Sequence, residues 1–169
     1  DNTFASSYLQ RPLELGADLS LLSTTKYTNG HSDALGGAVC TNDPVWRDRM
    51  VFAQKALGLQ PSPMDCWLTL RGLKTEAVRM ERHCANALRF AGFLEAESGA
   101  RFVRYPFLPS HPQYEIARRQ MAGGSGIVTA DFGRSLEDTL RFVESLRYFP
   151  KAESLGGIES LCCHPASMT

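Results

Sequence analysis

The segment LSLLSTTKYTNGHSD, residues 19–33, decides how the rest of the chain can be organised. It begins with a short apolar run, residues 19–22, and becomes polar over residues 23–33. This change predicts a short buried strand that leads into a functional loop, because binding and catalytic residues concentrate on loops that a rigid element positions. Residues 36–40, GGAVC, predict a second short strand after that loop.

Helices follow these strands in the sequence. A helix is predicted to begin at Pro44 and to end at Gly58, since proline favours a first helical turn and glycine a C-terminal cap. Residues 61–63 predict a linker, and residues 64–70 predict a short helix. The strongest helical pattern lies in residues 75–97, where small and apolar side chains recur at alternating spacings of three and four. These side chains are Ala77, Met80, Cys84, Ala87, Ala91 and Leu94.

Gly99 is expected to stop the long helix, and shorter elements are predicted after it. They are strands in residues 101–105 and 126–132 and helices in residues 112–121 and 135–146. Ser135 and Asp138 form a capping-box pattern for the last of these helices. Strands that alternate with helices favour an α/β fold, and the long helix would bridge two units, residues 1–77 and residues 78–169.

The composition is that of an ordinary globular protein, with 43% hydrophobic and 21% charged residues. Its 18 basic and 18 acidic side chains give a formal net charge of zero, so no global field would attract nucleic acid or an anionic membrane surface. No apolar run approaches the roughly 18 residues that span a bilayer, and no signal-peptide pattern is present. We therefore expect a soluble protein of the cytoplasm. The five cysteines have no disulfide or metal-binding spacing, so neither is predicted.

The tetrapeptide Ser23-Thr24-Thr25-Lys26 carries the chemistry that the residues alone suggest. A lysine amine can form an imine with an aldehyde, and hydroxyl groups one and three positions before it can donate hydrogen bonds to a phosphate. Pyridoxal phosphate requires this combination, and it also requires an acid beside its ring nitrogen, for which Asp1 is the candidate. The alternative is that Lys26 is a solvated surface residue, because a motif of four residues also arises by chance.

Longer segments make the chain similar to a known family. They read DNTFA (residues 1–5), PLELGAD (12–18), STTKY (23–27), NGHSD (29–33), PSPMDC (61–66), LRGLKT (70–75), VRMERH (78–83), LPSHPQ (108–113), ESLGG (153–157) and HPASMT (164–169). In order and spacing they resemble the trans-sulfuration family of pyridoxal-phosphate enzymes, which includes cystathionine γ-lyase, cystathionine γ-synthase, cystathionine β-lyase and methionine γ-lyase. The resemblance covers essentially the whole chain and is strongest to the γ-lyase and γ-synthase members.

This resemblance implies a fold and a set of site residues. Residues 1–77 would be the C-terminal part of an aspartate-aminotransferase-like (fold type I) cofactor domain, and residues 78–169 would belong to a smaller C-terminal α/β domain. The implied cofactor-binding residues are Lys26, which forms the Schiff base with pyridoxal phosphate and later moves protons, Asp1 at the ring nitrogen, and Ser23 and Thr25 at the phosphate. The family also implies a homotetramer whose active sites are shared across a dimer.

Glu153 and Ser154 are implied to lie at the substrate, a small sulfur amino acid. Cystathionine γ-enzymes of the family have a glutamate at the position of Glu153, methionine γ-lyases an apolar residue and β-lyases an aromatic residue. A carboxylate there suits the distal ammonium of cystathionine, which favours γ-elimination of cystathionine. Cystathionine γ-synthase, methionine γ-lyase and O-acylhomoserine sulfhydrylase activities stay open, as does a merely solvated Glu153.

Family chains are longer than this one, so the resemblance implies that these residues correspond to a C-terminal portion of the full enzyme. A polypeptide confined to them is expected to hold cofactor and substrate poorly, and an inactive fragment is the alternative outside the enzyme class. Seven other basic side chains of the family motifs are expected to be structural. They are His31, His83, His111, His164, Arg71, Lys74 and Arg79.

Overall fold

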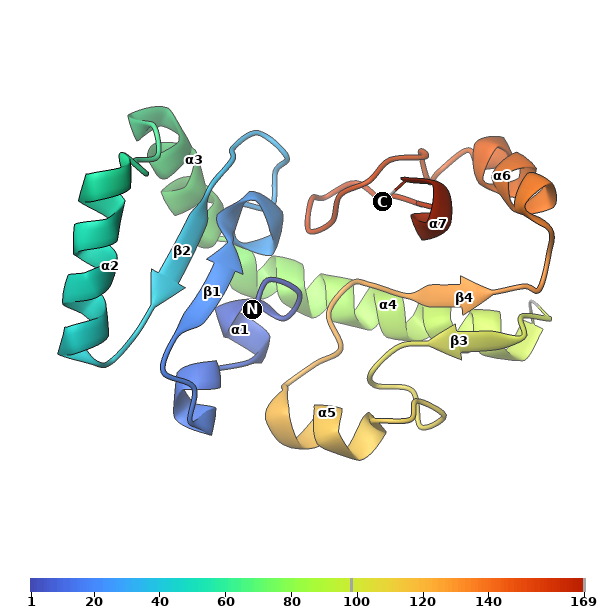
Figure 1. The fold of residues 1–169 in the computed structure, drawn as a ribbon. Coiled ribbons are helices and arrows are strands. Elements are labelled where there is room, and N and C mark those ends of the chain that lie inside the picture. The colour runs from blue at the N-terminus through green and yellow to red at the C-terminus, as the bar shows by residue number, and fades with distance from the viewer. Residues whose placement is uncertain (98, 169) are drawn as a thin grey trace.

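The structure, a computed structural model, describes residues 1–97 and 99–168. It has the predicted α/β fold, with two small sheets arranged along one long helix, α4 (Glu76–Glu97) (Figure 1). Before α4 lie α1 (Ser6–Leu9), the 3-10 turn η1 (Pro12–Leu15), β1 (Ser20–Ser23), the helical turn η2 (Thr24–Thr28), β2 (Gly37–Cys40), α2 (Pro44–Leu57) and α3 (Pro63–Leu73). After it lie β3 (Phe102–Arg104), α5 (Tyr114–Gln120), β4 (Thr129–Asp131), α6 (Leu136–Ser145) and α7 (Pro165–Met168).

Both sheets are antiparallel pairs, β1 with β2 and β3 with β4. All four predicted strands are therefore confirmed, although β3 and β4 are shorter than expected. The expected burial of the first strand is correct only in part, because Ser20 is buried whereas Leu21 is 44% exposed. The reason is that β1 has a single hydrogen-bonded neighbour among the described residues, and a two-stranded sheet covers its faces poorly.

The apolar stripe predicted for the long helix forms the centre of the core. Met80 and Ala91 of α4 are fully buried. Met80 packs in a cluster with Ala5, Leu9 and Tyr27 from the N-terminal part of the chain. Farther along the helix a second cluster contains Ala87, Ala91, Val103, Tyr105 and Leu108. The helix thus holds the segment around Tyr27 on one part of its length and the β3–β4 sheet on another.

Local signals place the helix ends where the sequence predicts them. α2 begins at Pro44, with the Asp43 side chain accepting a hydrogen bond from the backbone N–H of Val45, and it ends at Gly58, which has a left-handed φ of +68°. The capping box of α6 is confirmed, because the Ser135 hydroxyl accepts from the Asp138 N–H and donates to its carboxylate. α3 begins one residue before its predicted start because Ser62 caps it and places Pro63 in its first turn, and it continues beyond the predicted end to Leu73.

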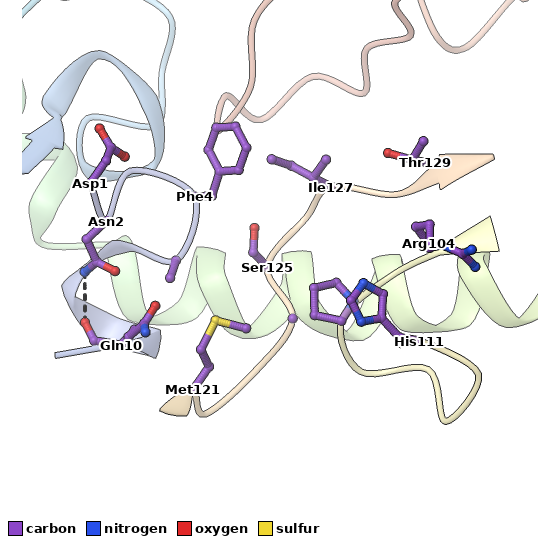
Figure 2. Close-up of a pocket in the computed structure, with 13 residues that line it drawn as sticks. Asp1, Asn2, Phe4, Gln10, Arg104, His111, Met121, Ser125, Ile127 and Thr129 are labelled. Atoms are coloured by element: carbon purple, nitrogen blue, oxygen red, sulfur yellow. Dashed lines mark hydrogen bonds between the residues drawn. The ribbon is translucent and has the colours of Figure 1, made fainter. Parts of the chain in front are cut away.

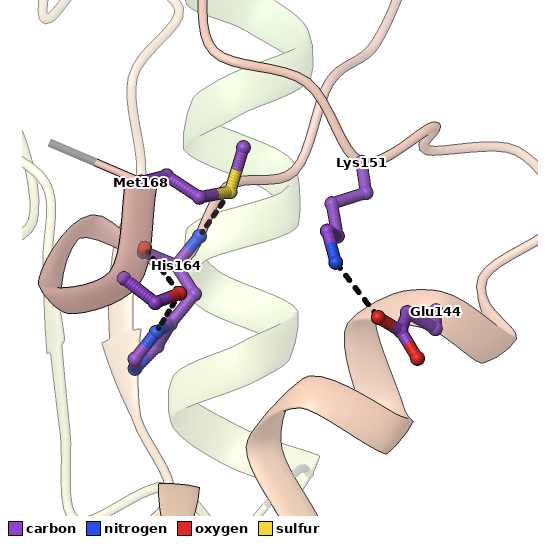
Figure 3. A network of polar contacts seen from close by, with 5 residues as sticks. Glu144, Lys151, His164 and Met168 are labelled. Carbon is purple, nitrogen blue, oxygen red and sulfur yellow. Dashed lines mark hydrogen bonds and ion pairs between the residues drawn. The ribbon is translucent and has the colours of Figure 1, made fainter. Parts of the chain in front are cut away.

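The C-terminal segment forms a loop that returns toward the N-terminal part of the chain (Figure 1). A bridge between Lys151 and Cys162 closes this loop at its base, where the Ala152 N–H donates to the Cys162 carbonyl at 3.2 Å. Lys151 also pairs with Glu144 of α6 at 2.7 Å, and the His164 ring contacts the Ser167 hydroxyl at 2.9 Å beside α7 (Figure 3). Residues 152–161 are therefore anchored at both ends. In the described residues no helix is both long and apolar enough to cross a membrane.

Candidate active site

Lys26 lies in the turn that follows β1. The turn is closed by two backbone hydrogen bonds, from the Asn29 N–H to the Thr24 carbonyl (2.9 Å) and from the Gly30 N–H to the Lys26 carbonyl (2.8 Å). Lys26 itself is half-buried and has a non-helical backbone, with φ −90° and ψ −125°, in the middle of this turn. The predicted order of strand and loop therefore places the lysine on a short, internally bonded turn at the end of a strand.

Lys26 and Ser154, predicted to belong to one site, meet in the structure although they are 128 residues apart. The Lys26 Nζ donates a hydrogen bond of 3.2 Å to the Ser154 hydroxyl. This approach depends on Gly156, whose φ is +82° and whose α-carbon faces the backbone of the lysine turn. A Cβ at Gly156 would lie 2.4 Å from the Tyr27 nitrogen and 2.6 Å from the Lys26 carbonyl carbon. Only a glycine lets residues 153–157, the ESLGG loop, sit this close.

The two hydroxyl side chains before Lys26 differ in their partners. The Thr25 hydroxyl accepts from the Gly36 N–H at 3.0 Å and donates to the Gly36 carbonyl at 3.3 Å, so it ties the turn to the segment before β2. Ser23 is half-buried, and its hydroxyl has no hydrogen-bond partner in the described part of the chain, while its backbone N–H donates to the Thr3 hydroxyl at 2.9 Å. The Ser23 hydroxyl is thus free to donate to a ligand.

Asp1 stands beside β1 because the N-terminal turn is bonded to that strand. The Asn2 N–H donates to the Leu21 carbonyl at 2.8 Å, and the Asp1 carboxylate accepts from the Thr3 N–H at 2.8 Å through its Oδ1. Asp1 is exposed, and among the described residues no hydrogen bond or ion pair joins it to Lys26. Glu153 is also exposed and has no ion-pair partner there. Both carboxylates therefore have oxygens available for a ligand.

A pocket of about 400 Å³ lies beside this group of residues, yet it is not centred on the lysine. Figure 2 shows Asp1 and Phe4 of the N-terminal turn on one side of it and Arg104 and Ile127 on the other. Lys26 is not among the residues that line the pocket. We therefore place the candidate site at the Lys26 amine and Ser154, and Asp1 lines the neighbouring pocket.

Tyr27, the neighbour of Lys26, is held by its ring and its hydroxyl. It is 2% exposed, and its hydroxyl oxygen accepts from the Ser125 hydroxyl and from the Gly126 N–H, each at 3.0 Å. Burial raises the pKa of Tyr27, an effect that the hydrogen bond from Ser125 opposes, so the phenol stays neutral near pH 7.

The ring of His83 packs against the Tyr27 ring at an angle of 72°, with 5.3 Å between the ring centroids. Burial, and then the charge of Arg79, lowers the pKa of His83.

Arg79 of α4 also holds the lysine turn, through hydrogen bonds to backbone carbonyls. Its Nη1 donates to the Tyr27 carbonyl at 2.6 Å, and its Nη2 donates to the carbonyls of Thr28 at 3.3 Å and Gly72 at 2.9 Å. Its Nε donates to the Thr75 hydroxyl at 3.0 Å. Burial lowers the pKa of Arg79, which nevertheless stays charged at neutral pH because a guanidinium titrates far above it.

Sequence reasoning placed Lys26, Ser154 and Ser23 near one another but did not identify the residues that hold them there. Tyr27, Arg79, Ser125 and Gly156 were not singled out for the site, and Arg79 was expected to be structural. A signal was available only for the glycine, since ESLGG contains adjacent glycines in a predicted loop. The contacts that Arg79, Ser125 and Gly126 make with residues 27 and 28 join positions between 51 and 99 apart, so no local pattern reveals them.

Comparisons with known proteins identify the family of this chain. The model of the Cys/Met metabolism PLP-dependent enzyme family matches residues 1–169. The chain is 52% identical to a cystathionine γ-lyase of Bos taurus, covering 100% of this chain and 42% of that protein. A crystal structure of cystathionine γ-synthase from Xanthomonas oryzae pv. oryzae superposes with a TM-score of 0.96 at 47% identity, covering 100% of this chain and 44% of that one. A methionine γ-lyase structure from Micromonospora echinospora gives a TM-score of 0.94 at 40% identity, covering 100% and 46%.

The chain thus spans less than half the length of the relatives that it matches. The family match nevertheless extends over every residue, and the relatives that share the fold have several different activities. The cofactor that the family implies is pyridoxal phosphate. The chain belongs to the family of PLP-dependent enzymes of cysteine and methionine metabolism.

Proposed function

We propose that this protein is a trans-sulfuration enzyme of the cystathionine γ-lyase type, which cleaves cystathionine by γ-elimination with Lys26 as its cofactor-bearing lysine. The observation that carries the proposal is the 3.2 Å hydrogen bond between Lys26 Nζ and Ser154 Oγ. This bond joins Lys26, the lysine of the Ser23–Lys26 tetrapeptide, to the loop that contains Glu153. A reactive amine and a substrate-selecting carboxylate would then face one substrate.

The side chains around Lys26 fit pyridoxal phosphate. The Ser23 hydroxyl has no partner among the described residues and can donate to a phosphate, while Thr25 shapes the same turn through Gly36. Asp1 has a carboxylate oxygen that is not used by Thr3 and can pair with a protonated ring nitrogen. When bound, pyridoxal phosphate supplies an electron sink that stabilises negative charge at the substrate α-carbon.

With the cofactor bound, a free Lys26 amine would have a second task, which is to move protons. The free amine is a general base for the proton at the substrate Cα and then an acid and base at Cβ, where the proton must move before the γ-bond to sulfur breaks. A lysine side chain has about 2 kcal/mol of rotamer entropy, so an undirected amine would be a poor proton carrier. The Ser154 hydroxyl accepts a hydrogen bond from this amine and restricts where it lies.

Glu153 is proposed to select cystathionine. It is exposed beside Ser154, and no cation of the described chain pairs with it, so its carboxylate can attract the distal ammonium of cystathionine. Replacing Glu153 by Val should lower kcat/KM for cystathionine about tenfold relative to methionine, which corresponds to roughly 1.4 kcal/mol. Glu153→Gln, which keeps the size but removes the charge, is the matched control for shape. An unchanged preference in both variants would remove Glu153 from substrate selection.

The decisive test of the function is borohydride reduction of the intact protein with pyridoxal phosphate, followed by peptide mass spectrometry. A stable pyridoxyl adduct is expected on Lys26, with exposed Lys74 as the control for nonspecific labelling. Failure to label Lys26 would favour the catalytically inactive alternative. With the adduct established, assays with cystathionine, with methionine, and with cysteine plus an activated homoserine separate γ-lyase, methionine γ-lyase and γ-synthase. Sulfide plus an activated homoserine tests for sulfhydrylase.

Three further features are part of the proposal. A homotetramer with active sites shared across a dimer rests on the family resemblance. A location in the cytoplasm and a boundary between two units at residues 77 and 78 rest on the sequence pattern. The boundary falls inside α4, after its first two residues, Glu76 and Ala77.

A further inference from the structure

The carbonyl groups that follow Lys26 need partners from outside their own turn. Inside the turn, the Asn29 N–H bonds the Thr24 carbonyl and the Gly30 N–H bonds the Lys26 carbonyl. The carbonyls of Tyr27 and Thr28 are instead bonded by Arg79, which is 52 and 51 residues away in the sequence. The same guanidinium bonds the Gly72 carbonyl at the end of α3, so one side chain joins the lysine turn, α3 and α4.

The surrounding backbone leaves room for this side chain and for little else. Gly30 has a φ of +72°, and a Cβ there would lie 1.9 Å from the Arg79 Nη1. A Cβ at Gly72 would lie 2.1 Å from the Asn29 carbonyl oxygen, so α3 meets the turn backbone to backbone. Gly30 and Gly72 therefore allow the turn to pack closely against both the guanidinium and α3. The contact is a close-packed one and differs from a surface ion pair.

We propose that Arg79 is a positioning residue for Lys26: by fixing the Tyr27 and Thr28 carbonyls, it sets the place of the Lys26 amine opposite Ser154. This inference rests on the proposed role of Lys26 in holding the cofactor. Ser125 and Gly126 donate hydrogen bonds to the Tyr27 hydroxyl, and Arg79 donates to the Tyr27 carbonyl. The residue after Lys26 is therefore held both at its backbone and at the end of its side chain.

The contact requires an arginine and not simply a positive charge. The planar guanidinium uses three nitrogens, Nη1, Nη2 and Nε, toward four acceptors that lie in different directions. A lysine has one nitrogen on a flexible stem and cannot reproduce that fork. Arg79→Lys therefore keeps the charge near His83 and removes the geometry. Arg82→Lys, at an exposed position on the next turn of the same helix, is the matched control.

The test measures the rate at which the intact apoprotein forms the borohydride-trapped pyridoxyl adduct on Lys26, per folded molecule by circular dichroism, together with kcat and KM. Arg79→Lys is expected to lower the adduct rate and kcat by about tenfold or more, since a displacement near 1 Å can cost up to about a hundredfold, with KM changed less than about twofold. Arg82→Lys should match the wild type. A folded Arg79→Lys protein with a wild-type adduct rate would overturn the inference.

A second variant decides the matter if Arg79→Lys does not fold. Thr75→Val removes the acceptor of the Arg79 Nε but leaves the guanidinium in the protein. It is expected to slow adduct formation about threefold, while Thr75→Ser, which keeps the hydroxyl, should restore the rate. An unchanged rate in Thr75→Val would overturn the inference by itself. Absence of any Lys26 adduct in the wild type is a different result, because it would overturn the proposed function on which this inference depends.

Discussion

Replacing Gly156 by alanine should separate the chemistry of Lys26 from the stability of the fold. The residue has a φ of +82°, a conformation that costs a residue with a Cβ about 1–2 kcal/mol. The new Cβ would also lie 2.4 Å from the Tyr27 nitrogen, where ordinary contacts begin at 3.4 Å. Because that atom belongs to the backbone of an internally bonded turn, we expect the ESLGG loop to retreat, and the retreat needed is about 1 Å.

A retreat of this size breaks the contact at the amine. The bond from Lys26 Nζ to Ser154 Oγ is already 3.2 Å long, so a shift of about 1 Å carries it beyond hydrogen-bonding distance. We expect kcat to fall about a hundredfold, the order of loss that a misplacement of about 1 Å can cause. The bridge between Lys151 and Cys162 still anchors the loop at its base, so the protein should remain folded.

Steady-state kinetics and urea unfolding of the same preparations provide the assay. Gly58→Ala is the matched control, since its φ is +68° and its Cβ would meet nothing within 4 Å. That variant should lose about 1–2 kcal/mol of unfolding free energy and keep the wild-type kcat. If Gly156→Ala keeps kcat within about twofold of the wild type, the close approach of the loop does not position Lys26. If Gly58→Ala lowers kcat equally, the loss reflects general destabilisation.

Other predictions concern stability. Gly92 lies inside α4 and its Cβ would meet nothing within 4 Å, so Gly92→Ala should raise the unfolding free energy by about 0.5–1 kcal/mol in a urea titration. Ser135→Ala removes the cap of α6 and should lower it by about 1 kcal/mol, whereas Ser135→Asp should restore most of the loss. Burial and Arg79 lower the pKa of His83, so the folded state favours its neutral form. Stability from this group is present above the unfolded pKa of about 6.5 and is lost as the pH falls toward the folded pKa, and Tm should therefore drop less between pH 7.5 and 5.5 in His83→Gln than in the wild type.

The elements whose signals are local were predictable from the sequence. Pro44 and Gly58 bound α2 because a first-turn proline and a left-handed glycine act on their own neighbours, and Ser135 caps α6 for the same reason. The exposure of Leu21 was not predictable, because it depends on how many strands flank β1 and on what covers the sheet. Local patterns determine which residues form an element, but neighbours far away in the sequence determine what the element buries.

The candidate site also has features that the sequence predicted and features that it did not. The tetrapeptide ending in Lys26 indicated the amine and its hydroxyl groups, and the family resemblance connected them to Glu153 and Ser154. The sequence did not predict the distance between Lys26 and Ser154 or the close approach at Gly156. It also did not predict the hydrogen bonds from Arg79 to the lysine turn. Each depends on packing between segments that are distant in the chain, and an arginine on a helix has the same local pattern whether it faces water or a buried carbonyl.

The contacts that hold Tyr27 in the lysine turn come mainly from residues after position 77. Tyr27 is bonded by Arg79 through its carbonyl and by Ser125 through its hydroxyl, and its backbone nitrogen is approached by Gly156. All three partners follow the proposed boundary at residues 77 and 78, whereas Lys26 precedes it. The boundary therefore divides the chain in sequence, but the site is assembled across it. A displacement of one unit relative to the other would move the amine with respect to Ser154, so the packing between the units is itself part of what positions Lys26.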